Sequence, residues 1–298
     1  MAEQPISRGL GIVLLLVMAT VFGSNHVAAR IAFDHGANVT TAVAFRSTGT
    51  ALAVLALLLF TGTSIRVERK TFVRSVLVGL CIAAQSYCLY SAVALIPVAL
   101  ALLAFQTFPM LLALISWLAG AERPSRRVLL AMPVALTGLS LALDVWAKGG
   151  DLAGRWTEIG AGVLWALGAS VSFALAMFLT TRWQAGMDGR LRSFFSMSVV
   201  AIVVLAGGAL GGGFALPRDG TGWLALLLLT ALYGTAITSM FVLLPRLGMV
   251  NNAAVLNFEP IAVLAIAWVV LGQAIAPLQI AGAFVVVGAI MWMGSGRK

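Results

Sequence analysis

The sequence predicts an all-α membrane protein with ten transmembrane helices, arranged as two inverted five-helix repeats with both termini cytoplasmic. Apolar residues make up 61% of the 298 residues, and charged residues make up 10%. Soluble chains average roughly 45–50% apolar and about 25% charged residues, so this chain could not cover a surface that faces only water. The apolar residues also gather in long runs, and the second half of the chain weakly repeats the first. This composition excludes a disordered chain, a nucleic-acid-binding domain and a secreted disulfide scaffold.

Ten apolar runs of about 20 residues are each long enough to cross roughly 30 Å of hydrocarbon as a helix. In order, they cover residues 10–31, 39–60, 74–96, 98–119, 126–146, 157–181, 191–212, 222–244, 251–271 and 276–294. Nine short loops and two short tails remain, which leaves no room for a separate soluble domain. We expect the first repeat at residues 1–148 and the second, inverted repeat at residues 149–298.

The division between the third and fourth spans at Pro97 rests on length and charge. The stretch from Ser75 to Ala119 contains no charged residue, and its length suits two spans better than one. Lys and Arg gather on the cytoplasmic side of membrane proteins. With ten spans and the N-terminus inside, 14 of the 19 Lys and Arg residues fall in inner segments, four in outer segments, and Arg46 within a span. If the two spans are fused, the two sides hold eight and ten, and the bias disappears.

A weak internal repeat relates the two halves. Residues 102–117 align with residues 253–268 at a shift of 151, about half the length of the chain. Pro109 then falls on Pro260. A repeat unit of five helices contains an odd number, so the second copy enters the membrane from the opposite side, as in many secondary transporters.

The two matched prolines are predicted hinges. Each lies in the middle of a span and removes one backbone hydrogen bond, so the carbonyl groups of Phe105 and Leu256 lose their normal donors. In lipid, such a carbonyl needs another partner or a wet cavity. Two interpretations follow: neighbouring helices stabilise a simple kink, or the kinks line a cavity. Polar residues beside both Pro109 and Pro260 favour the cavity.

Four ionisable residues lie well inside the predicted spans: His26, Arg30, Arg46 and Glu259. Charges in a membrane are costly, and they usually face a cavity or a partner. Glu259 is expected to bind a substrate amine or carry a proton; alternatively, it pairs with a nearby base or caps freed backbone groups. His26 could shuttle protons, or it could make an ordinary hydrogen bond. For Arg46 and Arg30 we expect structural pairing or extension toward the outer interface.

Ten polar or aromatic side chains within the spans are predicted to bind substrate. They are Asn25, His26, Gln85, Tyr90, Gln106, Phe108, Trp165, Tyr233, Asn257 and Glu259. For any one of them, the alternative role is interhelical hydrogen bonding or packing. Together they predict a mixed aromatic and amide cavity between the repeats, which suits a small zwitterion with an apolar side chain. Such a cavity offers almost no positive charge for a phosphate group.

Short motifs resemble those of the drug/metabolite transporter superfamily, in particular its ten-helix EamA-type branch. The motifs are Gly23-Ser24-Asn25 followed by Ala28-Ala29, then Phe45-Arg46, Glu259-Pro260 and Leu271-Gly272. They resemble the W-G-S-N opening of the family, its F-R at the start of span 2, and its E-P and L-G-E in span 9. Phe22 stands where the family commonly has Trp, and Gln273 where it has Glu, so no essential acid is expected at that loop position.

The resemblance covers nearly the whole chain and implies a transporter. Within the superfamily the chain is most similar to bacterial YddG-type amino-acid exporters, which implies aromatic and other apolar amino acids as substrates. We therefore expect a secondary transporter in the bacterial inner membrane that exports such metabolites by alternating access through a central cavity. Its expected partners are the amino acid, the lipid bilayer and, as a candidate coupling ion, the proton.

Two alternative functions are an exporter of other substrates and an enzyme. A multidrug exporter of the same fold would carry lipophilic cations and would use Glu259 as its acid. An intramembrane enzyme would need a motif such as His-Glu-x-x-His or paired catalytic aspartates, and the sequence contains neither. We predict no enzymatic activity, no metal and no cofactor. The absence of an ATP-binding motif argues against direct use of ATP.

Overall fold

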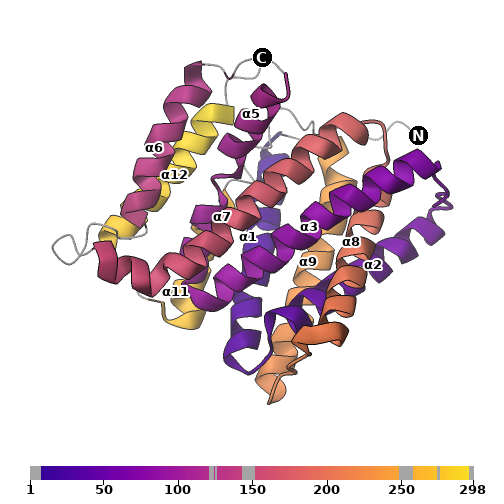
Figure 1. Cartoon of the computed structure of the whole chain (residues 1–298), viewed down its shortest axis with the longest axis horizontal. Helices are drawn as coiled ribbons and strands as arrows, with labels where there is room; N and C mark the ends of the chain where they lie inside the picture. The colour runs from indigo at the N-terminus through magenta and orange to yellow at the C-terminus, as the bar shows by residue number, and fades with distance from the viewer. Residues whose placement is uncertain are drawn as a thin grey trace.

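Every regular element that the structure describes is a helix (Figure 1). The structure is a computed structural model that describes residues 8–120, 124, 126–142, 152–247, 258–273 and 276–294. The first half contains α1 (Arg8–Asp34), α2 (Val39–Phe60), α3 (Arg69–Leu95), α4 (Val98–Phe105), α5 (Phe108–Leu118) and α6 (Arg126–Ala142). The second half contains α7 (Leu152–Trp183), α8 (Gly189–Gly207), the π-helix η2 (Gly208–Gly212), α9 (Gly220–Leu247), α11 (Glu259–Leu271) and α12 (Pro277–Gly294).

Helices occupy all ten predicted apolar ranges, as far as the structure describes them. Seven of the described stretches are long and apolar enough to cross a membrane, and one of these consists of α4 and α5 together. Shorter apolar helices are present in α11 and α12. The all-helical, multi-pass class is therefore confirmed, while the count of ten spans and the cytoplasmic side of both termini stay predictions.

The helix breaks at Ile96 and Pro97, where the sequence predicted a boundary between two spans. α3 ends at Leu95, and Ile96 has an extended backbone with φ −129° and ψ 165°. The ring of a proline forces the preceding residue out of the α-helical region, which explains this conformation. The Ile96 amide still donates to the carbonyl of Ala92 over 2.9 Å, so the last turn of α3 remains hydrogen-bonded.

A second interruption separates α4 from α5 at Gln106 and Thr107. The sequence predicted a kink here from Pro109, which is the second residue of α5. Pro260 is likewise the second residue of α11. Proline is tolerated in the first turn of a helix because its missing N–H would have no intrahelical partner there. In the two halves, the repeated prolines therefore mark the start of a new helix.

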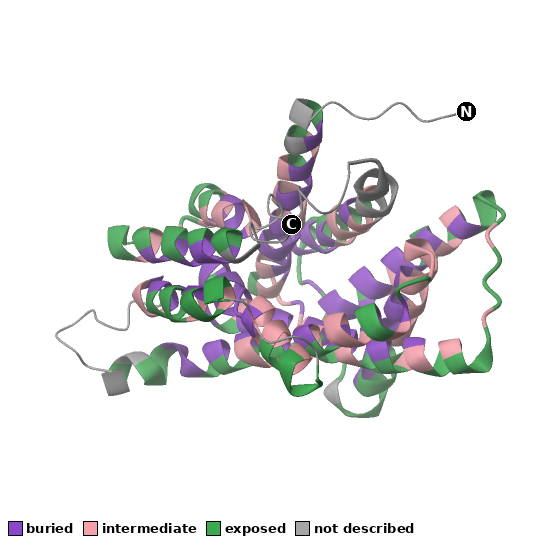
Figure 2. Ribbon diagram, turned by 90° about the horizontal axis from the view of Figure 1, so that it is seen from above, coloured by how far each residue is buried: buried purple, intermediate pink, exposed green. Residues whose placement is uncertain are grey.

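The helices of the two halves pair in a reciprocal pattern (Figure 1). α3 packs along α7, and α1 packs along α9 in the corresponding way. Similarly, α3 contacts α8 and α2 contacts α9, while α2 pairs with α8 and α6 with α12. Figure 2 shows the buried residues on the inner sides of these helices and the exposed residues on the outer sides. Two halves related by a two-fold axis produce such pairing, whereas their opposite orientation in the membrane stays a prediction.

Two glycines allow α6 and α12 to cross with their backbones in contact. A Cβ atom at Gly282 of α12 would overlap the backbone nitrogen of Ala142 and would lie 2.5 Å from the carbonyl oxygen of Gly138. A Cβ atom at Gly138 of α6 would lie 2.9 Å from the backbone nitrogen of Val286. Small residues permit this kind of close helix packing in membranes. The α6–α12 pair therefore depends on glycine on both sides.

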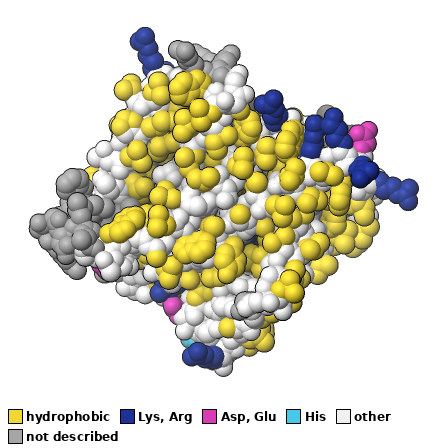
Figure 3. All heavy atoms as spheres, viewed as in Figure 1, with side chains coloured by type: hydrophobic (Ala, Val, Ile, Leu, Met, Phe, Trp, Pro, Cys, Tyr) yellow, Lys and Arg dark blue, Asp and Glu magenta, His cyan; other side chains and the backbone are white. Residues whose placement is uncertain are grey.

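Large apolar side chains cover much of the outside of the bundle. Figure 3 shows them spread over the visible face, with Lys and Arg side chains gathered at its edges. Leu59, Leu224 and Val269 are examples of large apolar side chains that are mostly exposed. A contiguous apolar surface is costly in water but suits contact with lipid. The outer surface thus agrees with a multi-pass membrane protein.

Candidate functional site

His26 of α1 and Glu259 of α11 are in contact across the two halves. The Nε2 atom of His26 lies 3.5 Å from the Oε1 atom of Glu259, with His26 buried and Glu259 partly exposed. Glu259 is the first residue of α11, where a negative side chain interacts favourably with the helix dipole. Gly23, one turn before His26, permits the close approach, because a Cβ atom there would lie 2.5 Å from the Cγ2 atom of Val263.

Tyr90 of α3 connects this pair to Asn25. The hydroxyl group of the fully buried Tyr90 donates to the Oδ1 atom of Asn25 over 2.6 Å. The Nδ2 atom of Asn25 in turn donates to the carbonyl of Phe22 over 2.6 Å. The centroids of the Tyr90 and His26 rings lie 5.7 Å apart. These contacts fix the side chains of Asn25, His26 and Tyr90 relative to one another.

Arg46 of α2 is buried inside the bundle, which corrects the expectation that it extends toward the outer interface. Arg46 is only 3% exposed. The Cζ atom lies 4.1 Å from the ring centroid of Tyr233 and 4.7 Å from that of Tyr90. The Nη2 atom donates to the Oγ atom of Ser86 over 2.7 Å. Aromatic faces attract a cation, so the guanidinium group has favourable neighbours in the interior.

These side chains form one group, which we call the polar cluster. It consists of Asn25, His26, Arg46, Ser86, Tyr90, Tyr233 and Glu259. Its members come from α1, α2, α3, α9 and α11, so both halves of the chain contribute. Sequence reasoning selected five of the seven and missed Arg46 and Ser86. The signal available for Arg46 was a charged residue within an apolar run, which is itself a sign of an interior partner.

The carbonyl group that Pro109 leaves without its helical donor has a partner on a neighbouring helix. Ser170 of α7 donates its hydroxyl group to the carbonyl of Phe105 over 2.8 Å. Thr107 donates to the Oγ atom of Ser170 over 3.0 Å, and both side chains are buried. For this proline, the interpretation that a neighbouring helix stabilises the break is therefore correct. Leu256, the corresponding residue of the second half, lies outside the described residues.

Phe108 belongs to an aromatic group next to this break. Its ring centroid lies 5.3 Å from that of Phe105 and 4.8 Å from that of Phe173 on α7. Gln106 is buried in the interruption between α4 and α5. The ring contacts of Phe108 are therefore with Phe105 and with Phe173 of α7, and neither ring belongs to the polar cluster.

The remaining predicted site residues differ in their positions. Gln85 is half-buried and accepts a long hydrogen bond from Ser86 over 3.4 Å, which places it beside the polar cluster. Trp165 is 40% exposed, and its ring packs on that of Tyr87 at 6.3 Å. The structure does not bring Trp165 to the polar cluster. Asn257 lies outside the described residues.

A group of contacts that sequence reasoning missed joins the α1–α2 loop to the segment before α9; we call it the loop clasp. The Nδ1 atom of His35 lies 2.7 Å from the Oδ2 atom of Asp219. The Nδ2 atom of Asn38 donates to the carbonyl of Gly213, and the amide of Arg218 donates to the carbonyl of His35. Two hydrogen bonds lower the pKa of Asp219. The larger effect comes from the backbone N–H of Gly222 and the next from the side chain of His35. The loop clasp therefore links the two halves at one end of α2.

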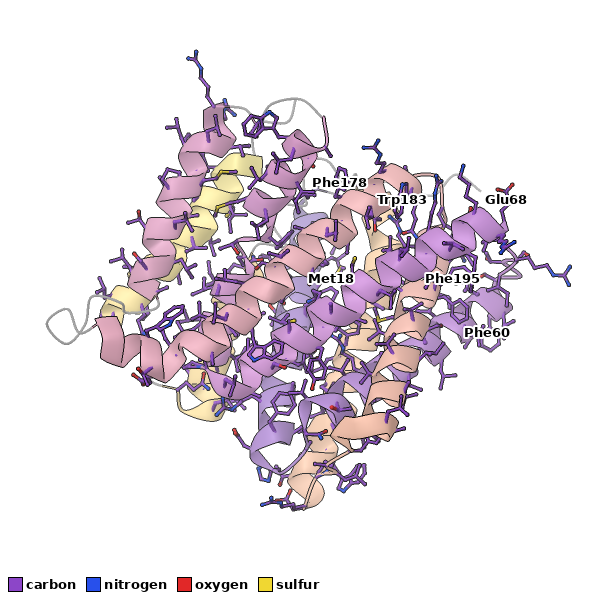
Figure 4. All side chains as sticks on the ribbon, viewed as in Figure 1. Met18, Phe60, Glu68, Phe178, Trp183 and Phe195 are labelled. Atoms are coloured by element: carbon purple, nitrogen blue, oxygen red, sulfur yellow. The ribbon has the colours of Figure 1, made fainter. Side chains whose placement is uncertain are left out.

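Contacts at the opposite end of α2 also join the two halves. Figure 4 shows Phe60 and Glu68 at either side of the α2–α3 loop. Arg190 of α8 donates to the Oγ1 atom of Thr61 over 2.9 Å. Asp188 pairs with Arg190, whose hydrogen bond lowers the pKa of Asp188. Both ends of the α2–α8 pair are therefore closed by polar contacts.

Within the described ranges, no three His, Cys, Asp or Glu side chains come together in a group that could hold a metal ion.

The sequence pattern of the EamA-like transporter family matches the chain twice, over residues 9–143 and 160–295. A search of curated proteins finds no match. A solved crystal structure of another protein aligns with a TM-score of 0.63 and 18% identity, covering 95% of this chain and 97% of that one. At this identity, the alignment compares the fold alone.

Proposed function

The chain belongs to the EamA-like transporter family, and we propose that it is a secondary transporter that exports aromatic and other apolar amino acids from the cytoplasm. Membership in the family supports transport of small molecules across a membrane. The narrower choice of amino acids, the outward direction and the absence of an ATP requirement are our proposal. The resemblance to YddG-type exporters supports the same choice of substrate.

The polar cluster is the observation that carries this proposal. Polar and charged side chains inside a membrane are costly, and they commonly mark a substrate or ion pathway. In secondary transporters built from two repeats, the substrate site lies where the repeats meet. Both halves contribute to the polar cluster, which combines aromatic rings with an acid, a base and an amide. This chemistry suits a zwitterion with an apolar side chain.

The proposed mechanism is alternating access around the polar cluster. The two halves would rock against each other and expose the substrate to one side of the membrane at a time. The helix starts at Pro109 and Pro260 are the proposed bending points, because the first turn of a helix is not braced by the hydrogen bonds of a continuous helix. The bacterial inner membrane is the proposed location.

Glu259 and His26 are the proposed proton carriers. A carboxylate and an imidazole in contact can share or exchange a proton. Because their helices, α1 and α11, belong to different halves, movement of the halves would change the contact. Proton binding and substrate movement would then be coupled.

Reconstituted liposomes test the proposal. Uptake of labelled phenylalanine, tryptophan, threonine and methionine is measured with and without a pH gradient, for the wild type and for Glu259→Gln. We expect saturable uptake that unlabelled amino acids compete, and we expect Glu259→Gln to lose the stimulation by the gradient. Glu68→Gln is the matched control, because Glu68 is exposed in the α2–α3 loop.

Two outcomes would contradict parts of this proposal. If Glu259→Gln transports normally at every pH gradient, Glu259 is not the coupling group. If no amino acid is taken up but a lipophilic cationic dye is, the alternative function of a multidrug exporter replaces amino-acid export.

A further inference from the structure

We propose that Arg46 binds the carboxylate group of the transported molecule, so that the protein selects small organic carboxylates with an apolar side chain. This inference rests on the proposed function and adds a substrate contact to it. From the sequence, Arg46 was expected to pair structurally or to extend toward the outer interface.

The first argument is that the charge of Arg46 has no negative partner among the described residues. Arg46 is 3% exposed, yet within the described part of the chain no carboxylate lies within ion-pair distance of it. Two other arginines, unlike Arg46, have acids close by: Arg30 contacts Asp34, and Arg190 contacts Asp188. A buried charge without a counter-charge is strongly unfavourable. An anionic ligand would remove this cost.

The second argument concerns hydrogen-bond donors. A guanidinium group carries five N–H donors in a planar fork that matches a carboxylate. Arg46 uses Nη2 to donate to the neutral hydroxyl of Ser86, and its buried Nε atom has no partner among the described residues. A donor buried without an acceptor is costly, so the Nε N–H group favours an incoming acceptor. A carboxylate would accept from this group and from a neighbouring N–H group of the same planar fork.

The third argument concerns how Arg46 is held. The rings of Tyr90 and Tyr233 lie 4.7 Å and 4.1 Å from its Cζ atom. Stacking on aromatic rings attracts the cation, and it leaves the buried Nε N–H group of Arg46 without an acceptor among the described residues. The rings come from α3 and α9, and hence from both halves. They position the guanidinium group before a ligand arrives, which lowers the entropy lost on binding.

The fourth argument is the distribution of charge in the polar cluster. Glu259, the acid of the polar cluster, contacts His26 and not Arg46. Tyr90 lies between these groups in the contact network, with its ring near both His26 and Arg46. The polar cluster therefore offers one positive and one negative group, which suits the two charges of an amino acid. A single arginine is a poor match for a doubly charged phosphate, so we assign the site to a carboxylate.

Binding to the purified protein in detergent tests the assignment with three related probes. Phenylalanine carries a carboxylate and an amine, phenylacetate carries only the carboxylate, and phenethylamine carries only the amine. For Arg46→Gln, we expect affinity for phenylalanine and phenylacetate to fall by at least about tenfold, because truncating one partner of a buried charge pair is costly. Affinity for phenethylamine should not fall. Arg66→Gln is the control, because Arg66 is exposed in the α2–α3 loop.

The assignment is overturned if Arg46→Gln binds phenylalanine like the wild type, or if it loses all three probes equally while remaining folded. A second measurement needs no variant: the wild type should bind phenylalanine methyl ester at least about tenfold more weakly than phenylalanine, because the ester has lost its charge-assisted hydrogen bonds. Equal binding of the ester and the acid would also overturn the assignment.

The outcomes separate this inference from the proposed function. If the wild-type protein binds phenylacetate through Arg46 but transports no amino acid in liposomes, amino-acid export is rejected and the carboxylate site stands. If the wild-type protein transports phenethylamine as efficiently as phenylalanine, the transport function stands and the carboxylate site is rejected.

Discussion

Tyr90 makes more contacts within the polar cluster than its sequence position indicates. Its hydroxyl group donates to Asn25, its ring packs against His26, and its face lies near the guanidinium group of Arg46. The residue is fully buried. A side chain that contacts three neighbours on two other helices holds these helices in one arrangement.

Replacing Tyr90 with phenylalanine tests the hydrogen bond alone. The ring contacts would remain, but the Oδ1 atom of Asn25 would lose its donor in a buried position. We expect destabilisation of about 1–3 kcal/mol, the cost of a buried unsatisfied group. The measurement is the melting temperature in detergent. Tyr87→Phe is the control, because Tyr87 is exposed, and an equal effect of both substitutions would contradict the expectation.

Asp219 predicts a pH dependence of the loop clasp. Its carboxylate accepts from the amide of Gly222 over 2.8 Å and lies 2.7 Å from His35, and these contacts lower its pKa. A carboxyl group with a lowered folded-state pKa stabilises the fold above its unfolded pKa of about 3.9 and loses this contribution as the pH falls through the folded value. We expect the wild type to be more stable than Asp219→Asn at pH values above this unfolded pKa.

Below about pH 4, this difference should shrink, because the wild-type carboxylate becomes protonated. Thermal unfolding of both proteins over a pH series measures it. A difference that is independent of pH down to full protonation would show that charge on Asp219 does not matter.

Residue identity within apolar runs explains why part of the site was predictable. Asn25, His26, Tyr90 and Glu259 were selected because polar groups are rare in lipid-spanning helices. The partners of Arg46 could not be predicted, because the two aromatic rings lie far away in sequence, on α3 and α9. The loop clasp was missed for the same reason, since its contacts join loops more than 170 residues apart.

At the scale of elements, two prolines were good guides to helix boundaries. Pro97 and Pro109 marked boundaries because the missing N–H and the ring act locally, whereas Pro133 lies inside α6. The partner of the freed Phe105 carbonyl, Ser170, could not be predicted, because a serine in an apolar helix usually bonds within its own helix. The boundaries at Pro97 and Pro109 were therefore predictable, but the interhelical partner of the Phe105 carbonyl was not.

The α6–α12 crossing yields a prediction at this scale. Gly282→Ala would place a methyl group against the backbone of α6, with no flexible side chain to move aside. We expect a loss of about 1–3 kcal/mol from overpacking, despite the better helix propensity of alanine. The melting temperature measures this effect. Gly288→Ala, also on α12, is the matched control, because a Cβ atom at Gly288 would have no neighbouring atom within 4 Å.

For Gly288→Ala we expect unchanged or slightly raised stability, since alanine favours helix over glycine. If Gly282→Ala is as stable as the wild type, the two backbones are not in contact in the membrane protein.

At the scale of the whole molecule, the repeat seen in the sequence corresponds to reciprocal helix pairing. The alignment of the segments around Pro109 and Pro260 predicted equivalent positions, and both prolines occupy the second position of a helix. The sequence could not predict which helices of opposite halves touch, because pairing depends on small residues and side-chain shapes that a weak repeat does not preserve.

The loop clasp provides a test of movement between the halves. In a background in which the two free cysteines, Cys81 and Cys88, are replaced with alanine, His35→Cys and Asp219→Cys are combined. A short reagent that joins two thiols would then fix the two loops together. We expect amino-acid uptake in liposomes to stop after cross-linking, because alternating access requires the halves to separate at one end.

The variant with His35→Cys alone, treated with the same reagent, should keep its uptake, because one thiol cannot bridge the loops. Undiminished transport by the fully cross-linked protein would mean that the loop clasp stays closed throughout the transport cycle.

The backbone contact between α6 and α12 has a mechanical consequence. Two helices whose backbones touch at Gly138 and Gly282 cannot slide far past each other, but they can pivot. Any relative motion that preserves this contact is therefore a rotation with the α6–α12 crossing as its fulcrum. Figure 1 places α2 and α8 at the other side of the bundle, so their lever arm is long. A small angular change at the glycines then becomes the largest displacement where α2 packs on α8.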